Sequence, residues 1–481
     1  MAVAGGRGGC LSGPGRLFVL HLPAPRGAPP VGRGCAMRLC PIVPAVMVAA
    51  VLAVPAARAA DALSPVCLAH AAASLDALTR GDYAGARKDF SNAMAVALGA
   101  SRLEQGWKAL QGGLGAYRSH DTVRQQVLAG HAVAVAAVSF ANMQFGFVAA
   151  CDARGKLTEY RFVPVAALAP TAVLAHAEAD GVQVLPLAVP TPIGPLHGAL
   201  TLPQGNGPFP ATVLLAGSGA NDMDETVGPN KPLRDIAEGL ARAGIASLRY
   251  DKRTFDHPEG GANLVVDAEV TDDAVTAARL LARQKEVDPQ RVFMLGNSLG
   301  AMMAPRIGRR DPQLAGLVLL AAPARPLLDV SAEQVRELGQ RNHDSAAQIA
   351  ADERAIVAEQ KLLASADPRH PPAGSFGGLS QGYWLSLYDY HQVAVAKALP
   401  MPMLILQGGG DFQVSPTLDF ARWQQALAGR PRAAFHLYPG LGHFFMPAGK
   451  TGTVADYRVP GHVDSQVIAD IAAWMKAQPA R

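Results

Sequence analysis

The spacing of hydrophobic residues separates an early helical part from a strand-rich part and from a long stretch where strands and helices alternate. From Pro65 to Leu110, apolar residues recur at helical spacing, with one break at Gly81 and Asp82. Three runs then read as strands: Val133 to Phe140, Phe145 to Cys151 and Leu157 to Val163. Helices followed by an antiparallel sheet predict a small α+β domain over residues 62–165.

A linker is expected over residues 166–181, and the pattern beyond it is typical of a parallel sheet. Val182 to Val189 and Leu196 to Leu202 read as an antiparallel pair. Further strands are expected at Ala211–Leu215, Ile245–Tyr250, Arg291–Leu295, Gly316–Leu320, Met403–Gln407 and Ala434–Tyr438, and helices at Arg234–Ala243, Asp267–Lys285, Thr417–Leu427 and Val463–Lys476. This alternation predicts an α/β fold over residues 182–481, with a doubly wound, mostly parallel sheet.

An insertion from Leu327 to Leu399 interrupts the alternation and is expected to form a helical cap. Its first part, Ser331 to Ala364, has a helical pattern with Ser331 as a candidate N-cap. Its second part contains the aromatic residues Phe376, Tyr383, Trp384, Tyr388 and Tyr390. These aromatic side chains either line a pocket or attach the cap to the rest of the domain.

The first 60 residues have the features of an extension followed by an export signal. Residues 1–36 are rich in Gly, Pro and Arg and are expected to be disordered, or not to be translated at all because Met37 offers a better start. Residues 37–59 then form a signal peptide, with Arg38 before an apolar run and cleavage after Ala59. The mature protein is therefore expected in the periplasm or outside the cell.

Charge and cysteine content narrow the possible functions. Six arginines and no other charged residues lie in residues 1–60, so the formal charge of +4 becomes −2 once they are removed. Such a chain without a basic cluster gives no support for nucleic-acid binding. Beyond the signal, only Cys67 and Cys151 remain, and they either form a disulfide or are two buried thiols.

A candidate nucleophile lies where a predicted strand meets a predicted helix. The apolar run before Gly296 leads into Gly296-Asn297-Ser298-Leu299-Gly300, and a helical segment of small residues follows. Glycines on both sides let the two backbones approach closely, while the serine hydroxyl points away from the sheet. Ser298 is therefore the predicted nucleophile.

A base, an acid and an oxyanion-binding loop each follow another predicted strand. Asp411 ends a glycine turn after Met403–Gln407, and His443 lies between Gly442 and aromatic residues after Ala434–Tyr438. Asp419 is the competing acid, but it reads as part of a solvated helix face, and His436 and His462 are weaker candidates for the base. The order serine, acid, histidine is that of α/β-hydrolase triads.

The glycine-rich loop Ala216 to Ala220 is the candidate oxyanion site. The N–H of Ser218, or alternatively that of Gly217, is expected to act with the N–H of Leu299. Charged and polar residues follow on two neighbouring loops: Asp222, Asp224, Glu225, Asn230, Lys231, Asp251, Lys252 and Arg253. They form either a substrate-binding rim or, the preferred interpretation, a salt-bridge network that fixes the loop.

Residues 182–475 resemble bacterial α/β-hydrolase carboxylesterases that carry a small N-terminal domain. The similarity is carried by GSGANDMDETVGPNKP (217–232), LRYDKR (248–253), VDPQRVFMLGNSLG (287–300) and LQGGGDFQV (406–414). The N-terminal part, with GDYAGARKDF, is similar to the cystatin-like or NTF2-like modules found before such hydrolases. Asn297 and Ala216 depart from the family pattern, which often has histidine at both positions.

The predicted function is hydrolysis of a small carboxylic ester by a secreted serine esterase. His443, oriented by Asp411, takes the Ser298 proton, and an acyl-enzyme forms and is hydrolysed. A peptidase, thioesterase or acyltransferase with the same triad is one alternative, and a non-catalytic ligand-binding protein is another. No cofactor or metal is expected, because His70, His120 and His131 have no acids or cysteines at metal-ligand spacing.

Overall fold

The computed structural model describes residues 63–128, 131–141, 144–168, 175–177, 181–257, 264–377 and 379–481. The expected extension, signal peptide and cleavage site lie outside these ranges. In the described ranges, none of the helices combines the length and the apolar composition needed to span a bilayer. The chain divides into two compact units between Pro170 and Thr171, inside the segment expected to be a linker.

The N-terminal unit places helices before an antiparallel sheet. Its elements are α1 (Pro65–Thr79), η1 (Gly85–Arg87), α2 (Asn92–Ala97), α3 (Ala100–Leu114), β1 (Tyr117–His120), β2 (Arg124–Leu128), β3 (His131–Phe140), β4 (Gln144–Cys151), β5 (Leu157–Pro164) and η2 (Val165–Leu168). The strands are ordered β1-β3-β4-β5, and β2 also pairs with β3. The strands β1 and β2 are shorter than the others, and the apolar pattern did not identify them.

A disulfide joins the first helix of this unit to its sheet. Cys67 in α1 is bonded to Cys151 at the end of β4, with their Cα atoms 5.9 Å apart. This bond decides between the two alternatives left open by the sequence. In the same unit, the buried Trp107 side chain of α3 packs against Tyr117, Phe140 and Phe162.

The larger unit is built on a nine-stranded mixed sheet. Its strands are β6 (His176–Ala177), β7 (Gln183–Pro186), β8 (Gly198–Leu202), β9 (Phe209–Leu215), β10 (Ala246–Tyr250), β11 (Val287–Asn297), β12 (Gly316–Leu320), β15 (Met403–Gly408) and β16 (Ala433–Tyr438). Their order is β16-β15-β12-β11-β9-β10-β8-β7-β6. The six strands from β16 to β10 are parallel, and β8, β7 and β6 are antiparallel to their neighbours. The predicted α/β class with a mostly parallel sheet is confirmed.

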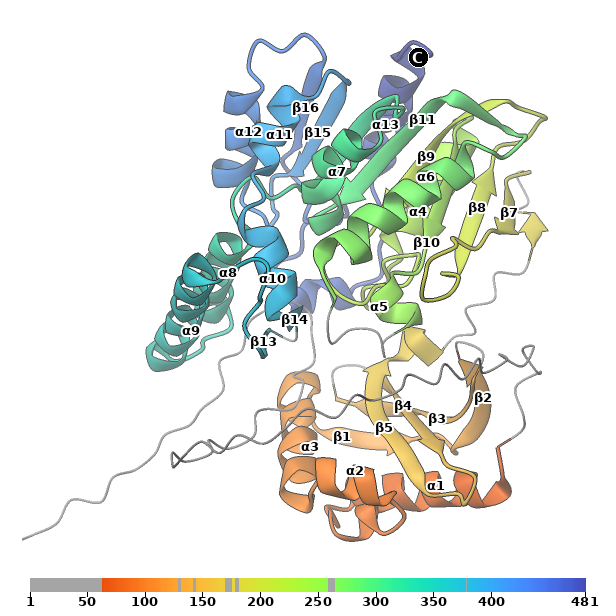
Figure 1. The fold of residues 1–481 in the computed structure, drawn as a ribbon, viewed down its shortest axis with the longest axis vertical. Helices are drawn as coiled ribbons and strands as arrows, with labels where there is room; N and C mark the ends of the chain where they lie inside the picture. Colours follow the sequence, from red (N-terminus) through yellow and green to blue (C-terminus); the bar gives the residue numbers. More distant parts are fainter. Residues whose placement is uncertain are drawn as a thin grey trace, which may run out of the picture. The chain divides into compact units, whose positions relative to one another are not determined.

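Helices cover both faces of this sheet, as the doubly wound prediction requires (Figure 1). On one face, α4 (Pro232–Arg242) and α13 (Ser465–Ala477) bury Leu233 and Val467 in one apolar cluster. On the other face, α6 (Asp273–Leu281), α7 (Leu299–Arg310) and α12 (Ala421–Ala426) contribute to a second cluster that includes Met302 and Trp423. The helices expected from Asp267 and Thr417 begin with π-helical turns, Asp267–Asp272 and Pro416–Phe420.

The expected cap lies between β12 and β15. It contains α8 (Leu327–Arg341), α9 (Ala346–Ser365), the short strands β13 (Ser375–Phe376) and β14 (Leu379–Ser380), α10 (Gln381–Tyr388) and α11 (Gln392–Ala398). The helical pattern expected from Ser331 to Ala364 is confirmed, and residues 342–345 divide it into two helices. Ser331 is not an N-cap: it lies inside α8, and its hydroxyl donates a hydrogen bond to the Leu327 carbonyl, while Ser345 caps α9.

Two cap aromatics attach the cap to the body of the domain. The Tyr383 hydroxyl donates a 2.6 Å hydrogen bond to Glu269, and the Tyr390 hydroxyl donates to the Met302 carbonyl at 2.9 Å. Both side chains are buried. The sequence left open whether the cap aromatics line a pocket or attach the cap, and Tyr383 and Tyr390 attach it.

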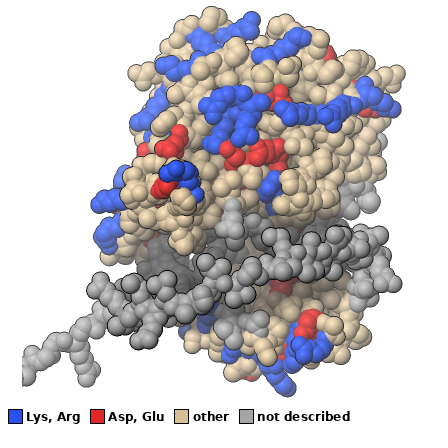
Figure 2. Space-filling view, viewed as in Figure 1, with Lys and Arg blue, Asp and Glu red and all other residues tan. Residues whose placement is uncertain are grey.

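Charges of both signs lie side by side on the face of the larger unit shown in Figure 2. Ion pairs of this kind join α7 to the π-helical turn Asp267–Asp272, which precedes α6. Arg306 pairs with Asp267 at 2.5 Å, and Arg310 pairs with Asp272 at 2.7 Å.

Candidate functional site

Ser298 lies on a sharp turn between β11 and α7. Its backbone has φ +52° and ψ −116°, a conformation that L-residues seldom adopt. A Cβ on Gly296 would lie 2.2 Å from the Gly300 carbonyl carbon, and a Cβ on Gly300 would lie 2.7 Å from the Leu215 oxygen. Because both flanking positions admit only glycine, the pattern that singled out Ser298 reflects a real steric requirement.

The predicted acid and base are in direct contact. His443 Nδ1 and Asp411 Oδ2 lie 2.8 Å apart, and both residues are buried. The other oxygen of Asp411 accepts the backbone N–H groups of Gln413 and Val414 at 2.7 and 3.0 Å. Gln407 Nε2 adds a 2.9 Å hydrogen bond to Oδ2. These donors fix the carboxylate in the orientation that binds the imidazole.

The glycines after β15 serve a close approach of two loops. A Cβ on Gly408 would lie 2.4 Å from the Gly442 carbonyl oxygen, and one on Gly409 would lie 2.7 Å from the Pro439 Cα. The glycine turn expected here packs tightly against the loop that carries His443. This packing holds Asp411 and His443 together.

All three predicted residues follow the carboxyl ends of parallel strands that are close neighbours in the sheet (Figure 1). The Ser298 N–H donates to the Leu320 carbonyl at 2.9 Å, which ties the turn to the end of β12. Among the described residues, no hydrogen bond joins the Ser298 hydroxyl to His443. Such catalytic contacts are often long without substrate. The catalytic roles of Ser298, Asp411 and His443 stay predictions.

The glycine-rich loop lies against the Ser298 turn. A Cβ on Gly217 would lie 3.0 Å from the Ser298 Cβ. Of the two N–H groups considered on this loop, that of Gly217 already donates to Glu225 Oε1 at 2.6 Å. Within the described part of the chain, no hydrogen bond from the N–H of Ser218 or of Leu299 is found. Ser218 and Leu299 therefore remain the available pair of donors.

Glu225 is the residue that sequence reasoning placed only in a charged set. The Glu225 backbone has a φ of +52°, and its side chain is buried. The carboxylate accepts hydrogen bonds from the Gly217 N–H and, at 3.2 Å, from Asn297 Nδ2. Burial raises its pKa from about 4.5 to about 7, although the hydrogen bonds from Gly217 and Asn297 and the charges of His443 and Lys252 oppose this rise. Asn297, the departure from the family pattern, is thus the partner of a buried acid. Glu225 follows the acidic residues Asp222 and Asp224, and nothing in this part of the sequence indicates that its side chain is buried.

The remaining charged residues mostly fix the loops around this carboxyl group. Asp224 pairs with Arg249 and with Lys231, both at 2.8 Å. Lys252 Nζ donates to the Gly217 carbonyl at 3.1 Å and lies 3.3 Å from Glu269. Asp222 accepts a hydrogen bond from the Thr226 N–H, and Asn230 donates to the Tyr457 and Val459 carbonyls. Arg253 forms an ion pair with Asp273 of α6. These contacts support the network interpretation over a substrate-binding rim.

The competing candidates are engaged elsewhere. The expectation that Asp419 lies on a solvated face is wrong: it is fully buried and pairs with Arg325 at 2.6 Å. His462 is exposed and contacts Asp235 at 3.1 Å, and His436 lies within β16. None of these groups takes the place of Asp411 or His443.

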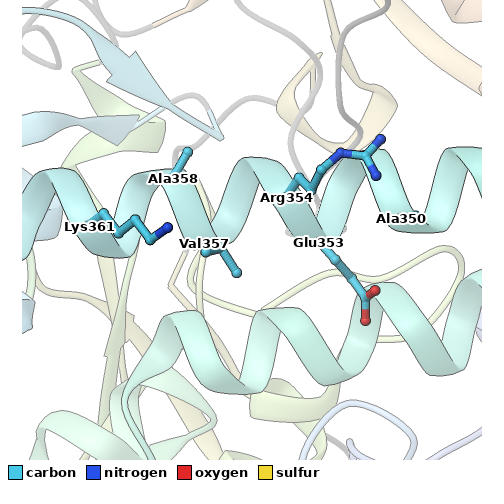
Figure 3. Close-up of a pocket in the computed structure, with 6 residues that line it drawn as sticks. All are labelled: Ala350, Glu353, Arg354, Val357, Ala358 and Lys361. Atoms are coloured by element: carbon cyan, nitrogen blue, oxygen red, sulfur yellow. The ribbon is translucent and has the colours of Figure 1, made fainter.

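A surface hollow along α9 is unrelated to this site (Figure 3). It is lined by Ala350, Glu353, Arg354, Val357, Ala358 and Lys361, which all come from that one helix. Glu353 points towards the neighbouring helix, where it accepts a hydrogen bond from Arg336 of α8 at 2.9 Å. The hollow contains none of the predicted catalytic residues.

Comparison with known proteins finds similarity to hydrolases over the part of the chain that contains the predicted triad. A protein family described as "Serine aminopeptidase, S33" matches residues 231–447, which include Ser298, Asp411 and His443. The chain is 40% identical over 280 residues to esterase EstD of Thermotoga maritima. This alignment covers 58% of the chain and 65% of the length of EstD, so it spans just under two thirds of that relative.

Solved structures with a similar arrangement are more distant. An esterase from Pyrobaculum calidifontis is 18% identical, with a TM-score of 0.41, over 61% of this chain and 85% of that one. An esterase from Pyrococcus furiosus is 14% identical, with a TM-score of 0.40, over 62% and 91% of the two chains.

Proposed function

We propose that this protein, whose residues 182–481 have the α/β-hydrolase fold, is a serine hydrolase that cleaves small carboxylic esters. The observation that carries the proposal is the buried 2.8 Å contact between His443 Nδ1 and Asp411 Oδ2, at the sheet edge where Ser298 sits on its strained turn. The 40% identity to an esterase supports esters as the substrate class.

The mechanism follows from which atoms are held and which are available. Asp411 binds Nδ1 of His443, so Nε2 is left to take the proton from the Ser298 hydroxyl. Ser298 then attacks the ester carbonyl, and the N–H groups of Ser218 and Leu299 stabilise the negative oxygen. The helix α7 begins at Leu299, so its N-terminal dipole favours the same charge. His443 gives its proton to the leaving alcohol, and water hydrolyses the acyl-enzyme by the reverse sequence.

The direct test replaces the nucleophile. Ser298→Ala is expected to abolish hydrolysis of p-nitrophenyl acetate and butyrate and to prevent labelling by a fluorophosphonate probe. Ser365→Ala, at the end of the cap helix α9, is the matched control and should keep both. Turnover that survives in Ser298→Ala would contradict the proposal, as would a folded wild type that the probe does not label. The second result would favour the non-catalytic binding protein.

Peptide-bond cleavage is the second candidate, because the matching family is described as a serine aminopeptidase. The same triad can open either bond, so only substrates separate the two. Aminoacyl p-nitroanilides and p-nitrophenyl esters of matched acyl groups should be compared by kcat/KM. We expect faster ester cleavage, whereas efficient anilide cleavage that requires a free α-amino group would favour the peptidase.

Export is part of the proposal. Mass spectrometry of the protein recovered from an expressing bacterium should find a mature N-terminus at Ala60, following cleavage after Ala59. An intact N-terminus on protein recovered from the cytoplasm would contradict it.

A further inference from the structure

Three side chains of the larger unit, none of them a member of the proposed triad, meet at the ends of β8, β10 and α5. His197 directly precedes β8, Asp251 directly follows β10, and Asp256 lies in α5 (Arg253–Asp256). One ligand atom from each of the three lies within 4.8 Å of the others. The backbone closes the group as well, because the Asp251 N–H donates to the His197 carbonyl at 2.8 Å.

One oxygen of Asp251 has no hydrogen-bond partner. The Asp251 side chain is fully buried, and its Oδ1 accepts the Met223 N–H at 2.6 Å. Its Oδ2 is buried without a partner among the described residues. Burying a carboxylate oxygen without a partner destabilises the fold, because the oxygen loses its hydrogen bonds to water and forms none with the protein.

The other two residues also present one atom each to the same place. Asp256 is 3% exposed, and its Oδ2 accepts the His197 N–H at 2.7 Å. Its Oδ1 lies 3.1 Å from His197 Nδ1. Asp251, the third member of the group, adds its unpartnered Oδ2, and the His197 side chain is partly exposed to solvent.

The charge around the three residues favours a cation. Asp256, Asp222 and Asp224 all lie close enough to Asp251 for their negative charges to act on it. Nearby basic side chains are paired with other acids: Arg249 with Asp224, Lys252 with Glu269 and Arg253 with Asp273.

We propose that His197, Asp251 and Asp256 bind a divalent transition-metal ion, with Zn²⁺ as the best fit. One imidazole and two carboxylates are ordinary zinc ligands at about 2.0–2.2 Å, so two atoms on one ion lie at most ~4.4 Å apart. The observed spacing of 4.8 Å or less needs only small side-chain rotations. The nitrogen ligand disfavours Ca²⁺ and Mg²⁺, which prefer oxygen.

The ion would act on structure and take no part in the proposed ester hydrolysis. Asp251 holds the Met223 N–H, and the Lys252 N–H donates to the Asn221 carbonyl, so the site adjoins the segment that leads from Ser218 to Glu225. Binding would join this segment to β8 and α5. Because the proposal concerns metal affinity and stability, it stands or falls separately from the esterase proposal.

Calorimetric titration of the metal-free full chain with ZnCl₂ tests the site. Wild type should bind one equivalent and show a higher melting temperature that EDTA reverses. His197→Gln and Asp251→Asn should both lose the binding event; His197→Gln, near the surface, covers the case in which Asp251→Asn does not fold.

The matched control is His462→Gln. It removes the histidine of another histidine–aspartate pair, with a 3.1 Å contact to Asp235, and among the described residues that pair belongs to no group of three possible metal ligands. This variant should bind Zn²⁺ as wild type does. Absence of stoichiometric Zn²⁺ binding by wild type would overturn the proposal. Binding that persists in His197→Gln would also overturn it, because the ion would then lie elsewhere.

Discussion

Glu225 accepts a 2.6 Å hydrogen bond from the Gly217 N–H, so a buried acid holds the loop that carries Ser218. The same carboxylate is bound by Asn297, the residue directly before Ser298. One ionisable group thus connects the proposed oxyanion loop to the proposed nucleophile turn, and its protonation state affects both.

This position makes stability depend on pH in a definite direction. The pKa of Glu225 is raised from about 4.5 to about 7 in the folded protein, mainly by burial. Between these values the folded protein keeps a proton that the unfolded chain has lost, so the free energy of unfolding falls as pH rises through this window. The loss is at most about 3 kcal/mol. Urea unfolding at pH 4.5, 6 and 8 should show a steeper decline for wild type than for Glu225→Gln, which cannot titrate. Equal slopes would mean that Glu225 ionises normally in the fold.

Asp411→Asn should lower kcat for ester hydrolysis by about 10⁴-fold while the protein stays folded. The amide no longer stabilises the imidazolium form of His443 and favours the wrong tautomer. Asp419→Asn is the matched control, since Asp419 is buried and pairs with Arg325 but has no contact with His443 among the described residues. It should reduce the melting temperature and leave kcat of the remaining folded protein close to wild type. The reverse pattern would exchange the roles of the two acids.

Gly408→Ala should separate Asp411 from His443. The added methyl group would lie 2.4 Å from the Gly442 oxygen, so the loop that carries His443 must move. We expect a destabilisation of about 1–3 kcal/mol and a clear loss of kcat. Gly440→Ala, in the same loop but with no atom within 4 Å of the added Cβ, should leave both nearly unchanged. Similar kinetics for the two variants would show that this close approach does not position the base.

Removal of the disulfide should weaken the N-terminal unit. Cys67 and Cys151 are 84 residues apart in sequence, and closing a loop of that length stabilises the folded state by about 4.6 kcal/mol. The double variant Cys67→Ser and Cys151→Ser should therefore unfold at lower denaturant concentration. Trp107 reports on the unit, because no other tryptophan lies in residues 63–168. An unchanged Trp107 fluorescence transition would rule out a stabilising role for the bond.

Much of the fold of the larger unit could be predicted, because its parallel strands are buried on both faces. Such strands are short, continuous apolar runs, and Gly316–Leu320 matches the observed strand residue for residue. The Ser298 turn was also readable, since two glycines at fixed positions have a steric cause. Asp411 and His443 followed from the rule that sites lie at the carboxyl ends of strands.

Features that depend on contacts between distant segments could not be predicted. Asp419 falls in a helical pattern, and its burial is explained by partners from a distant segment, the Arg325 side chain and the Ala324 N–H. The Glu225 side chain points inward from a backbone with positive φ. No residue type in that segment predicts such a backbone conformation. The break between α8 and α9 was missed because charged residues continue across it without proline or glycine.

The paired helices α8 and α9 carry an apolar cluster of their own. Leu328, Val335, Ile356 and Leu363 are buried there together with Trp384 of α10, whereas Tyr383 and Tyr390 fasten the following segment to the domain body. One set of side chains therefore packs the α8–α9 hairpin internally, and a different set attaches the following cap segment to the domain body. Homologues could exchange or lengthen this hairpin without disturbing the parallel strands, which makes it the natural place to graft new selectivity by recombination.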